Sequence, residues 1–122
     1  MNNYFHDIKG EALANNYFRR VVETGEKMQV VLMSIAPGEE IGMEVHPDNE
    51  QFLLSVAGRG KVILNGEENE FNAGDMVLVK AGMEHNFITV GNEPMKIITL
   101  YSPPHHAPGT IHKTKAEAEA SE

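Results

Sequence analysis

Four polar side chains in the sequence have the types and the spacing needed to bind one metal ion. They fall in two patterns, Gly38-x5-Glu44-x-His46-x4-Gln51-x6-Gly58 and Gly74-x7-Gly82-x2-His85. Residues two apart on a β-strand share a face, so Glu44 and His46 are expected to point the same way. Imidazole and carboxylate groups suit first-row transition metals, and the side-chain oxygen of Gln51 can serve as a further, neutral ligand.

The chain around these residues predicts an all-β domain from residue 19 onward. Short runs rich in β-branched and aromatic residues alternate with Gly, Asn, Asp and Pro, which is typical of strands joined by turns. The expected strands are 21–22, 28–36, 52–56, 61–64, 69–71, 76–79, 87–90 and 96–101. Asn65-Gly66 lies between two of them and predicts a type I′ hairpin, because both turn positions need a positive φ. The hairpin would connect the regions that carry the two patterns.

Helical signals are confined to the ends of the chain. Residues 11–15 are expected to form a helical turn. Near the C-terminus, Thr114-x-x-Glu117 predicts a capping box, followed by alternating Ala and Glu. A short C-terminal helix should therefore follow Thr114, and its lack of an apolar stripe predicts only weak packing.

Composition limits the classes of function. A chain of 122 residues is expected to form one domain with its own core. It has no cysteine, which excludes disulfides, thiolate metal sites and thiol nucleophiles. The formal net charge of −8 argues against nucleic acid and anionic membranes as partners. No apolar run approaches the roughly 20 residues of a membrane span, so a cytoplasmic protein is expected.

The two patterns resemble the motifs of the cupin superfamily, Gly-x5-His-x-His-x3,4-Glu-x6-Gly and Gly-x5-Pro-x-Gly-x2-His-x3-Asn. The resemblance covers roughly residues 30–102. It implies a double-stranded β-helix, or jelly-roll, barrel with a short C-terminal helix, a single cupin domain over 1–122 with its barrel core at about 19–102, and a tail at 103–122. Lys80 and Thr89 depart from the motif at positions that are not ligands.

By this resemblance the metal ligands are Glu44, His46, Gln51 and His85. Glu44 takes the place of the first His, and Gln51 takes the place of the usual carboxylate. The set still contains one anion and three neutral groups, which favours a re-tuned site over a decayed one. The shorter x3 spacing would use Glu50, but the fixed distance to Gly58 favours Gln51, and neighbouring strand residues project to opposite faces.

The resemblance is to small bacterial cupins described as mannose-6-phosphate isomerase-like, and it implies a divalent transition metal: Zn, Ni, Mn or Fe. The first hypothesis is an enzyme that uses the ion as a Lewis acid, in an isomerase or lyase reaction on a sugar-like or carbonyl substrate. An Fe(II) dioxygenase and a non-enzymatic binding or structural module are the alternatives. The expected partners are a small molecule and, as in other single-domain cupins, a second copy of the chain in a homodimer.

Several other residues are weaker candidates. His105, His106 and His112 lie in the tail after Ser102-Pro103-Pro104, where a solvated loop is favoured, although the tail could fold over the barrel or onto a partner subunit. Pocket candidates are Phe52, Phe87, Tyr101, Arg59 and Lys80, and titratable groups near the ligands are Asp48, Glu50, Glu84 and Tyr101.

Overall fold

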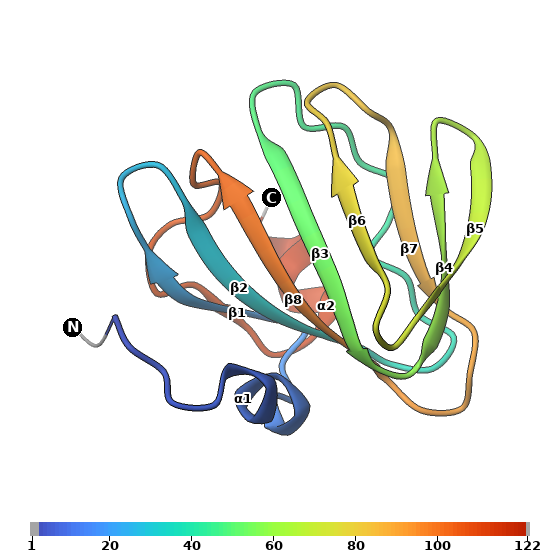
Figure 1. The fold of residues 1–122 in the computed structure, drawn as a ribbon, viewed down its shortest axis with the longest axis horizontal. Helices are drawn as coiled ribbons and strands as arrows, with labels where there is room; N and C mark the ends of the chain where they lie inside the picture. The colour runs from blue at the N-terminus through green and yellow to red at the C-terminus, as the bar shows by residue number, and fades with distance from the viewer. Residues whose placement is uncertain (1–2, 122) are drawn as a thin grey trace.

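The structure, a computed structural model that describes residues 3–121, contains two antiparallel β-sheets (Figure 1). The six-stranded sheet has the order β6-β3-β8-β2-β1-β9, and the three-stranded sheet has the order β5-β4-β7. The strands are β1 Arg19–Thr24, β2 Gln29–Ile35, β3 Glu50–Ala57, β4 Arg59–Leu64, β5 Glu67–Asn72, β6 Met76–Val79, β7 His85–Thr89, β8 Met95–Ser102 and β9 Ile111–His112. This is the predicted jelly-roll architecture, in which non-consecutive strands become neighbours.

The hydrophobic core joins the inner faces of the two sheets. Alternate residues of each strand point inward, as the two-residue period of a strand requires. Leu53 and Ile97 come from the large sheet, and Val62, Phe71 and Phe87 come from the small one; each is at most 2% exposed. The same alternation places Gln51, two residues before Leu53, on the inner face. The burial of the core residues of β3 therefore determines the direction in which the Gln51 side chain points.

The predicted Asn65-Gly66 hairpin is confirmed. Asn65 has φ 48° and Gly66 has φ 84°, and Leu64 pairs with Glu67 on either side of the turn. Positive φ at both turn positions matches the right-handed twist of the flanking strands β4 and β5. The hairpin thus joins the edge strand β5 to the central strand β4 of the small sheet. β7 pairs with the other side of β4.

The segment 36–49 carries Glu44 and His46, which were expected to share one face as on a strand, but it is not a regular strand. It forms isolated bridges between Glu40 and Ile88 and between Glu44 and His85, and thus follows β7 without a continuous ladder. Gly38 and Gly42 have φ of 79° and 111°, and Pro37 and Pro47 have no N–H to donate. These residues interrupt the hydrogen-bond pattern while leaving single bridges intact.

Both terminal helices form. α1 spans Ile8–Ala14, and α2 spans Lys115–Ala120 with Thr114 as its N-cap, whose side chain accepts a hydrogen bond from the Glu117 backbone N–H. α2 contacts the core through one buried residue, Ala118, which is consistent with the predicted weak packing. Over residues 3–121 no helix is long and apolar enough to cross a membrane.

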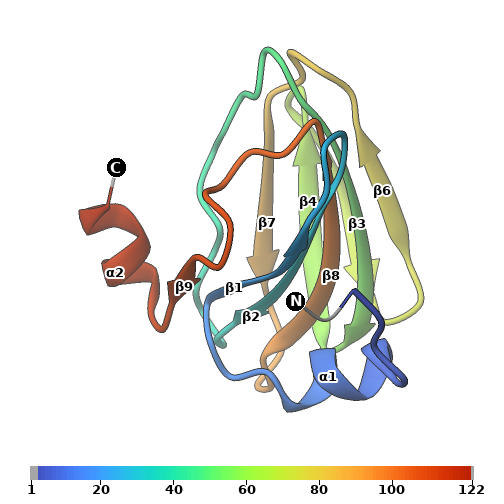
Figure 2. The ribbon, with the colours of Figure 1, turned by 90° about the vertical axis from the view of Figure 1, so that its left-hand side faces the viewer.

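The tail was expected to be a solvated loop, with folding over the barrel as the alternative. Residues 103–110 do form a loop in which most residues are exposed, but the tail also folds back along the barrel. Figure 2 shows the tail leaving β8 and returning to the β1 side of the molecule, where it ends in β9 and α2. β9 adds to the large sheet by pairing Ile111 with Arg20 and His112 with Arg19. The pairing supplies backbone hydrogen bonds that a loop-based interpretation of the Pro-rich sequence does not anticipate.

We expect Gly58→Ala to destabilise the fold more than Gly66→Ala. Both glycines have nearly the same φ, 87° and 84°. The backbone strain that a Cβ causes at positive φ should therefore lower the free energy of unfolding by a similar amount in both variants. A Cβ on Gly58 would lie 2.6 Å from the Pro94 carbonyl oxygen and 2.9 Å from the Met95 Cα, whereas one on Gly66 meets nothing within 4 Å. Chemical denaturation should give an unfolding free energy about 1–3 kcal/mol lower for the Gly58 variant than for the Gly66 variant. Equal losses would contradict this packing argument.

Candidate metal centre

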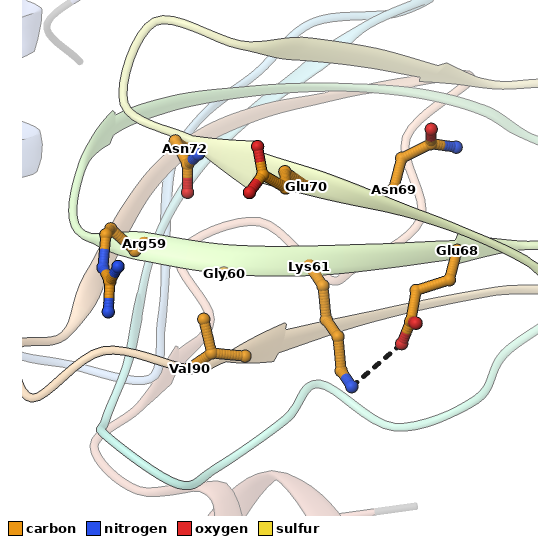
Figure 3. Close-up of a pocket in the computed structure, with 8 residues that line it drawn as sticks. All are labelled: Arg59, Gly60, Lys61, Glu68, Asn69, Glu70, Asn72 and Val90. Carbon is orange, nitrogen blue, oxygen red and sulfur yellow. Dashed lines mark ion pairs between the residues drawn. The ribbon is translucent and has the colours of Figure 1, made fainter.

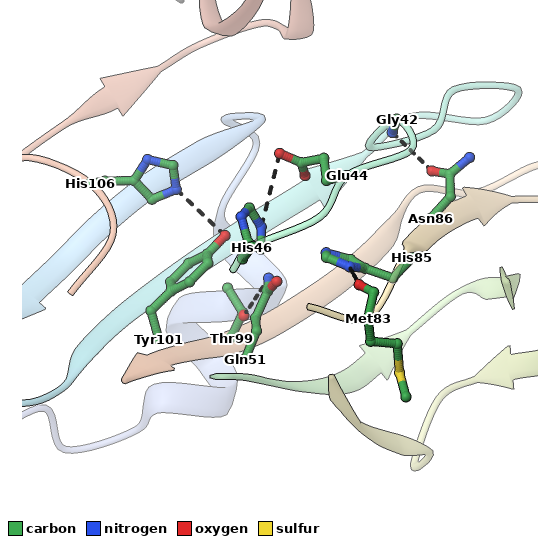
Figure 4. A network of polar contacts seen from close by, with 10 residues as sticks. All are labelled: Gly42, Glu44, His46, Gln51, Met83, His85, Asn86, Thr99, Tyr101 and His106. Atoms are coloured by element: carbon green, nitrogen blue, oxygen red, sulfur yellow. Dashed lines mark hydrogen bonds and ion pairs between the residues drawn. The ribbon is translucent and has the colours of Figure 1, made fainter. Parts of the chain in front are cut away.

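Glu44, His46 and His85 come together where the 36–49 segment meets β7. Glu44 and His85 exchange two backbone hydrogen bonds, each 2.9 Å long, so they face each other directly. One ligand atom from each of the three side chains lies within 4.8 Å of the other two. Figure 4 shows the three side chains pointing toward one another. This arrangement could hold a metal ion, as the spacing predicted.

The backbone fixes the orientation and the protonation of His85. Its Nδ1 lies 2.8 Å from the Met83 carbonyl oxygen, which can only accept, so Nδ1 donates. Burial lowers the pKa of His85, and the ring is therefore neutral at pH 7 with its lone pair on Nε2. Nε2 is buried and has no hydrogen-bond partner among residues 3–121. A carbonyl partner behind the ring is the usual way in which proteins orient a metal-binding histidine.

His46 is also held neutral. It is 6% exposed, and burial, followed by charge interactions with His105, His85 and Arg19, lowers its pKa to about 4. Its Nε2 is 4.0 Å from a carboxylate oxygen of Glu44, too far for a hydrogen bond, and it has no such partner in the described chain. A neutral imidazole nitrogen beside a carboxylate is a competent metal ligand.

Gln51 reaches the same cluster from the large sheet. It is 3% exposed, and its side-chain N–H donates to the Thr99 hydroxyl at 3.2 Å. Its carbonyl oxygen is buried and has no hydrogen-bond partner in residues 3–121, and Figure 4 shows its side chain directed toward the two imidazoles. Glu50, the alternative in the shorter spacing, is exposed. The geometry thus brings Gln51, and not Glu50, to the other three predicted ligands.

Two tail histidines, His105 and His106, lie close to this cluster, in line with the alternative that the tail folds over the barrel. The ring of His105 is 4.4 Å from that of His46 and stacks on Tyr101 at 5.3 Å. His106 Nε2 is 3.4 Å from the Tyr101 hydroxyl. Burial, the main cause, raises the pKa of Tyr101 and lowers that of His106 to about 3. Both groups are therefore neutral at pH 7.

Gln29 holds the tail in this position. It is fully buried on β2, and its side-chain oxygen accepts from the backbone N–H groups of His105, at 3.1 Å, and His106, at 3.0 Å. Its N–H group donates to the His106 carbonyl at 2.6 Å and to the Thr24 hydroxyl at 3.0 Å. Gln29 is thus a buried polar side chain whose oxygen and nitrogen are both hydrogen-bonded, and three of its four bonds go to the loop. A glutamine at a core-facing position of the predicted strand 28–36 was the signal that sequence reasoning missed.

The remaining candidates lie elsewhere. Phe87 is in the core behind His85, and Phe52 lies on the outer face of the large sheet, opposite in direction to Gln51. Lys80, Asp48 and Glu84 are exposed. Arg59 lines a polar groove on the outer side of the small sheet, shown in Figure 3, which an ion pair of 2.9 Å between Lys61 and Glu68 crosses. The groove shares no lining residue with the metal cluster.

Comparisons with known proteins place the chain in a family. The cupin domain model matches residues 31–101. Protein YrkC of Bacillus subtilis is 43% identical over 114 residues, which cover 88% of this chain but only 61% of YrkC. Protein L612 of Acanthamoeba polyphaga mimivirus is 34% identical over 123 residues, covering 97% of this chain and 76% of L612. The crystal structure of BH2720 from Bacillus halodurans is 40% identical, with a TM-score of 0.95 over 98% of this chain and 95% of that one. The chain belongs to the cupin domain family.

Proposed function

We propose that the chain is a metal-dependent enzyme that acts on a small sugar-like or carbonyl compound, in a reaction of the isomerase or lyase type. One observation carries the proposal. Three buried atoms, His46 Nε2, His85 Nε2 and Gln51 Oε1, lack hydrogen-bond partners in the described chain, although they come from three different segments. A buried polar atom without a partner destabilises a protein by about 1–3 kcal/mol, so a common partner for all three is the economical explanation.

The donor set fits a divalent transition metal. Two neutral imidazoles, one carboxylate and one amide oxygen are nitrogen and oxygen donors of the kind that Zn, Ni, Mn and Fe accept. Four protein donors leave positions open for a substrate on an ion that prefers six. A bound divalent ion would supply Lewis-acid polarisation of a substrate oxygen.

The protein's own contribution is to hold these donors in place before any ion arrives. The Met83 carbonyl keeps the proton of His85 on Nδ1, and the Thr99 hydroxyl turns the Gln51 amide so that its oxygen faces the cluster. The low pKa of His46 keeps its lone pair free at pH 7. This preorganisation supports a rigid site, as catalysis requires.

A second candidate is an Fe(II) dioxygenase. Glu44, His46 and His85 have the composition of the two-histidine, one-carboxylate triad found in non-haem iron oxygenases. Gln51 counts against this candidate, because a fourth protein ligand would occupy one of the positions that O2 and substrate need. The identity of the metal separates the two candidates, and a non-enzymatic binding module remains the interpretation if no metal binds.

The first test is elemental analysis of protein purified without added metal or chelator. We expect about one equivalent of a transition metal per chain and its loss in the double variant His46→Ala, His85→Ala. Iron would direct activity assays toward O2 chemistry, and zinc, nickel or manganese toward isomerase and lyase reactions. If neither protein holds metal, even after incubation with each ion, the proposed function is wrong.

A second test concerns the neutral ligand. We expect Gln51→Glu to bind the metal at least tenfold more tightly than the wild type, because a carboxylate replaces an amide at the same position. Competition against a chromophoric chelator would measure both affinities. Glu50→Gln, one residue away on the exposed face, is the control and should leave the affinity unchanged. An effect at Glu50 with none at Gln51 would show that the ligand assignment is one residue out of register.

A further inference from the structure

The outer face of the six-stranded sheet carries an uncharged apolar surface. The strand register sets outward-facing side chains of β6, β3 and β8 side by side in two rows. The first row is Leu78, Phe52 and Leu100, and the second is Met76, Leu54 and Ile98. We call these six residues the outer apolar face. Val30 extends it onto β2 by pairing with Leu100. Met76 and Leu78 are 52% and 48% exposed, and the other four are partly exposed.

α1 covers one end of this side of the sheet, where it contacts β8, β3 and β2. Figure 1 shows α1 at the lower end of the sheet, and Figure 2 shows it projecting on the side opposite α2. Lys96, near the start of β8, donates a hydrogen bond to the backbone carbonyl of Asn15, which follows the helix. Lys9 of the helix lines a groove beside Leu54 and Val56. The helix therefore forms a step at this end, and the first row of the outer apolar face lies beyond it.

The face beyond α1 has the size and composition of one side of a dimer interface. Four strands about 4.8 Å apart, with about three rows of side chains about 7 Å apart, give a flat area of about 400 Å², of which the apolar rows fill about two thirds. The relief of the side chains and the flank of α1 add to this area. A standard interface buries about 800 Å² on each partner, and homodimer interfaces are about 65% apolar. β6 is also an edge strand, and an exposed apolar edge promotes association.

We propose that the outer apolar face is the contact surface of a homodimer, in which two copies pack this face together with their strands running in opposite directions. The inference goes beyond the proposed function and does not depend on it. The formal net charge of −8 makes two copies repel each other, and the six uncharged residues provide a surface where they can meet. The pairing of two identical surfaces closes with two-fold symmetry.

α1 selects the relative orientation of the two copies. Packed sheets keep their strands within about 30° of one another, so the two-fold axis runs either along the strands or across them. An axis along the strands would set α1 against α1 and hold the sheets apart. An axis across the strands places each α1 beyond the free end of the other sheet and stacks β3 on the reversed β3 of the other copy. Lys9 lies beside Val56 near the end of β3, and Glu50 begins that strand. Lys9 of each copy then faces Glu50 of the partner subunit, so opposite charges meet twice.

The experiment is sedimentation equilibrium of the full chain at micromolar concentrations. We expect the wild type to have twice the chain mass of 13.5 kDa. Leu78→Glu puts a charge into the contact and should weaken the dimer at least tenfold. Leu78 is half exposed in the single chain, so this variant should still fold. Val90→Glu is the matched control, because Val90 is 49% exposed and lines the outer groove of the small sheet. Its dimer should be as tight as that of the wild type.

Two charge reversals test the orientation, and they decide the matter if Leu78→Glu does not fold. Lys9→Glu and Glu50→Lys change exposed side chains. Each alone sets like charges against each other and should weaken the dimer at least threefold, whereas the double variant should restore it. A monomeric wild type would overturn the proposal, as would a dimer that Leu78→Glu leaves intact or that Val90→Glu weakens equally. A double variant that binds no more tightly than the single variants would also overturn it.

Discussion

Buried polar atoms need partners, and this requirement governs the inner side of the barrel. The backbone of Met83 and the hydroxyl of Thr99 satisfy one group each of His85 and Gln51, and they leave the opposite atom of each side chain facing the same place as His46 Nε2. Both contacts belong to elements whose positions the hydrophobic core fixes. The donors are thus arranged by the fold and do not depend on the ion for their direction.

The two sheets and the irregular segment between β2 and β3 each supply different ligands of the proposed metal site. The large sheet supplies Gln51, the small sheet supplies His85, and the 36–49 segment brings Glu44 and His46 against β7 through single bridges. The tail then adds a third side, fixed by Gln29, with His105 packed on His46.

Much of the fold and of the cluster could be predicted because the signals were local. Alternation gave the strands, Asn65-Gly66 gave the hairpin, and Thr114-x-x-Glu117 gave the cap of α2. The motif spacing gave the four residues that the structure places together. The path of the tail could not be predicted, because it depends on hydrogen bonds from Gln29, which lies 76 residues before His105. The homodimer stays a prediction.

The central claim is that one ion is bound by Glu44, His46, Gln51 and His85. The most direct measurement is a crystal structure of the protein soaked with Mn(II) or Co(II), with anomalous diffraction data collected at the absorption edge of the metal. The account predicts one strong anomalous peak within bonding distance, about 2.0–2.3 Å, of His46 Nε2, His85 Nε2, Gln51 Oε1 and a Glu44 carboxylate oxygen. A peak bound instead to the tail histidines, or a peak that Gln51 does not approach, would contradict it.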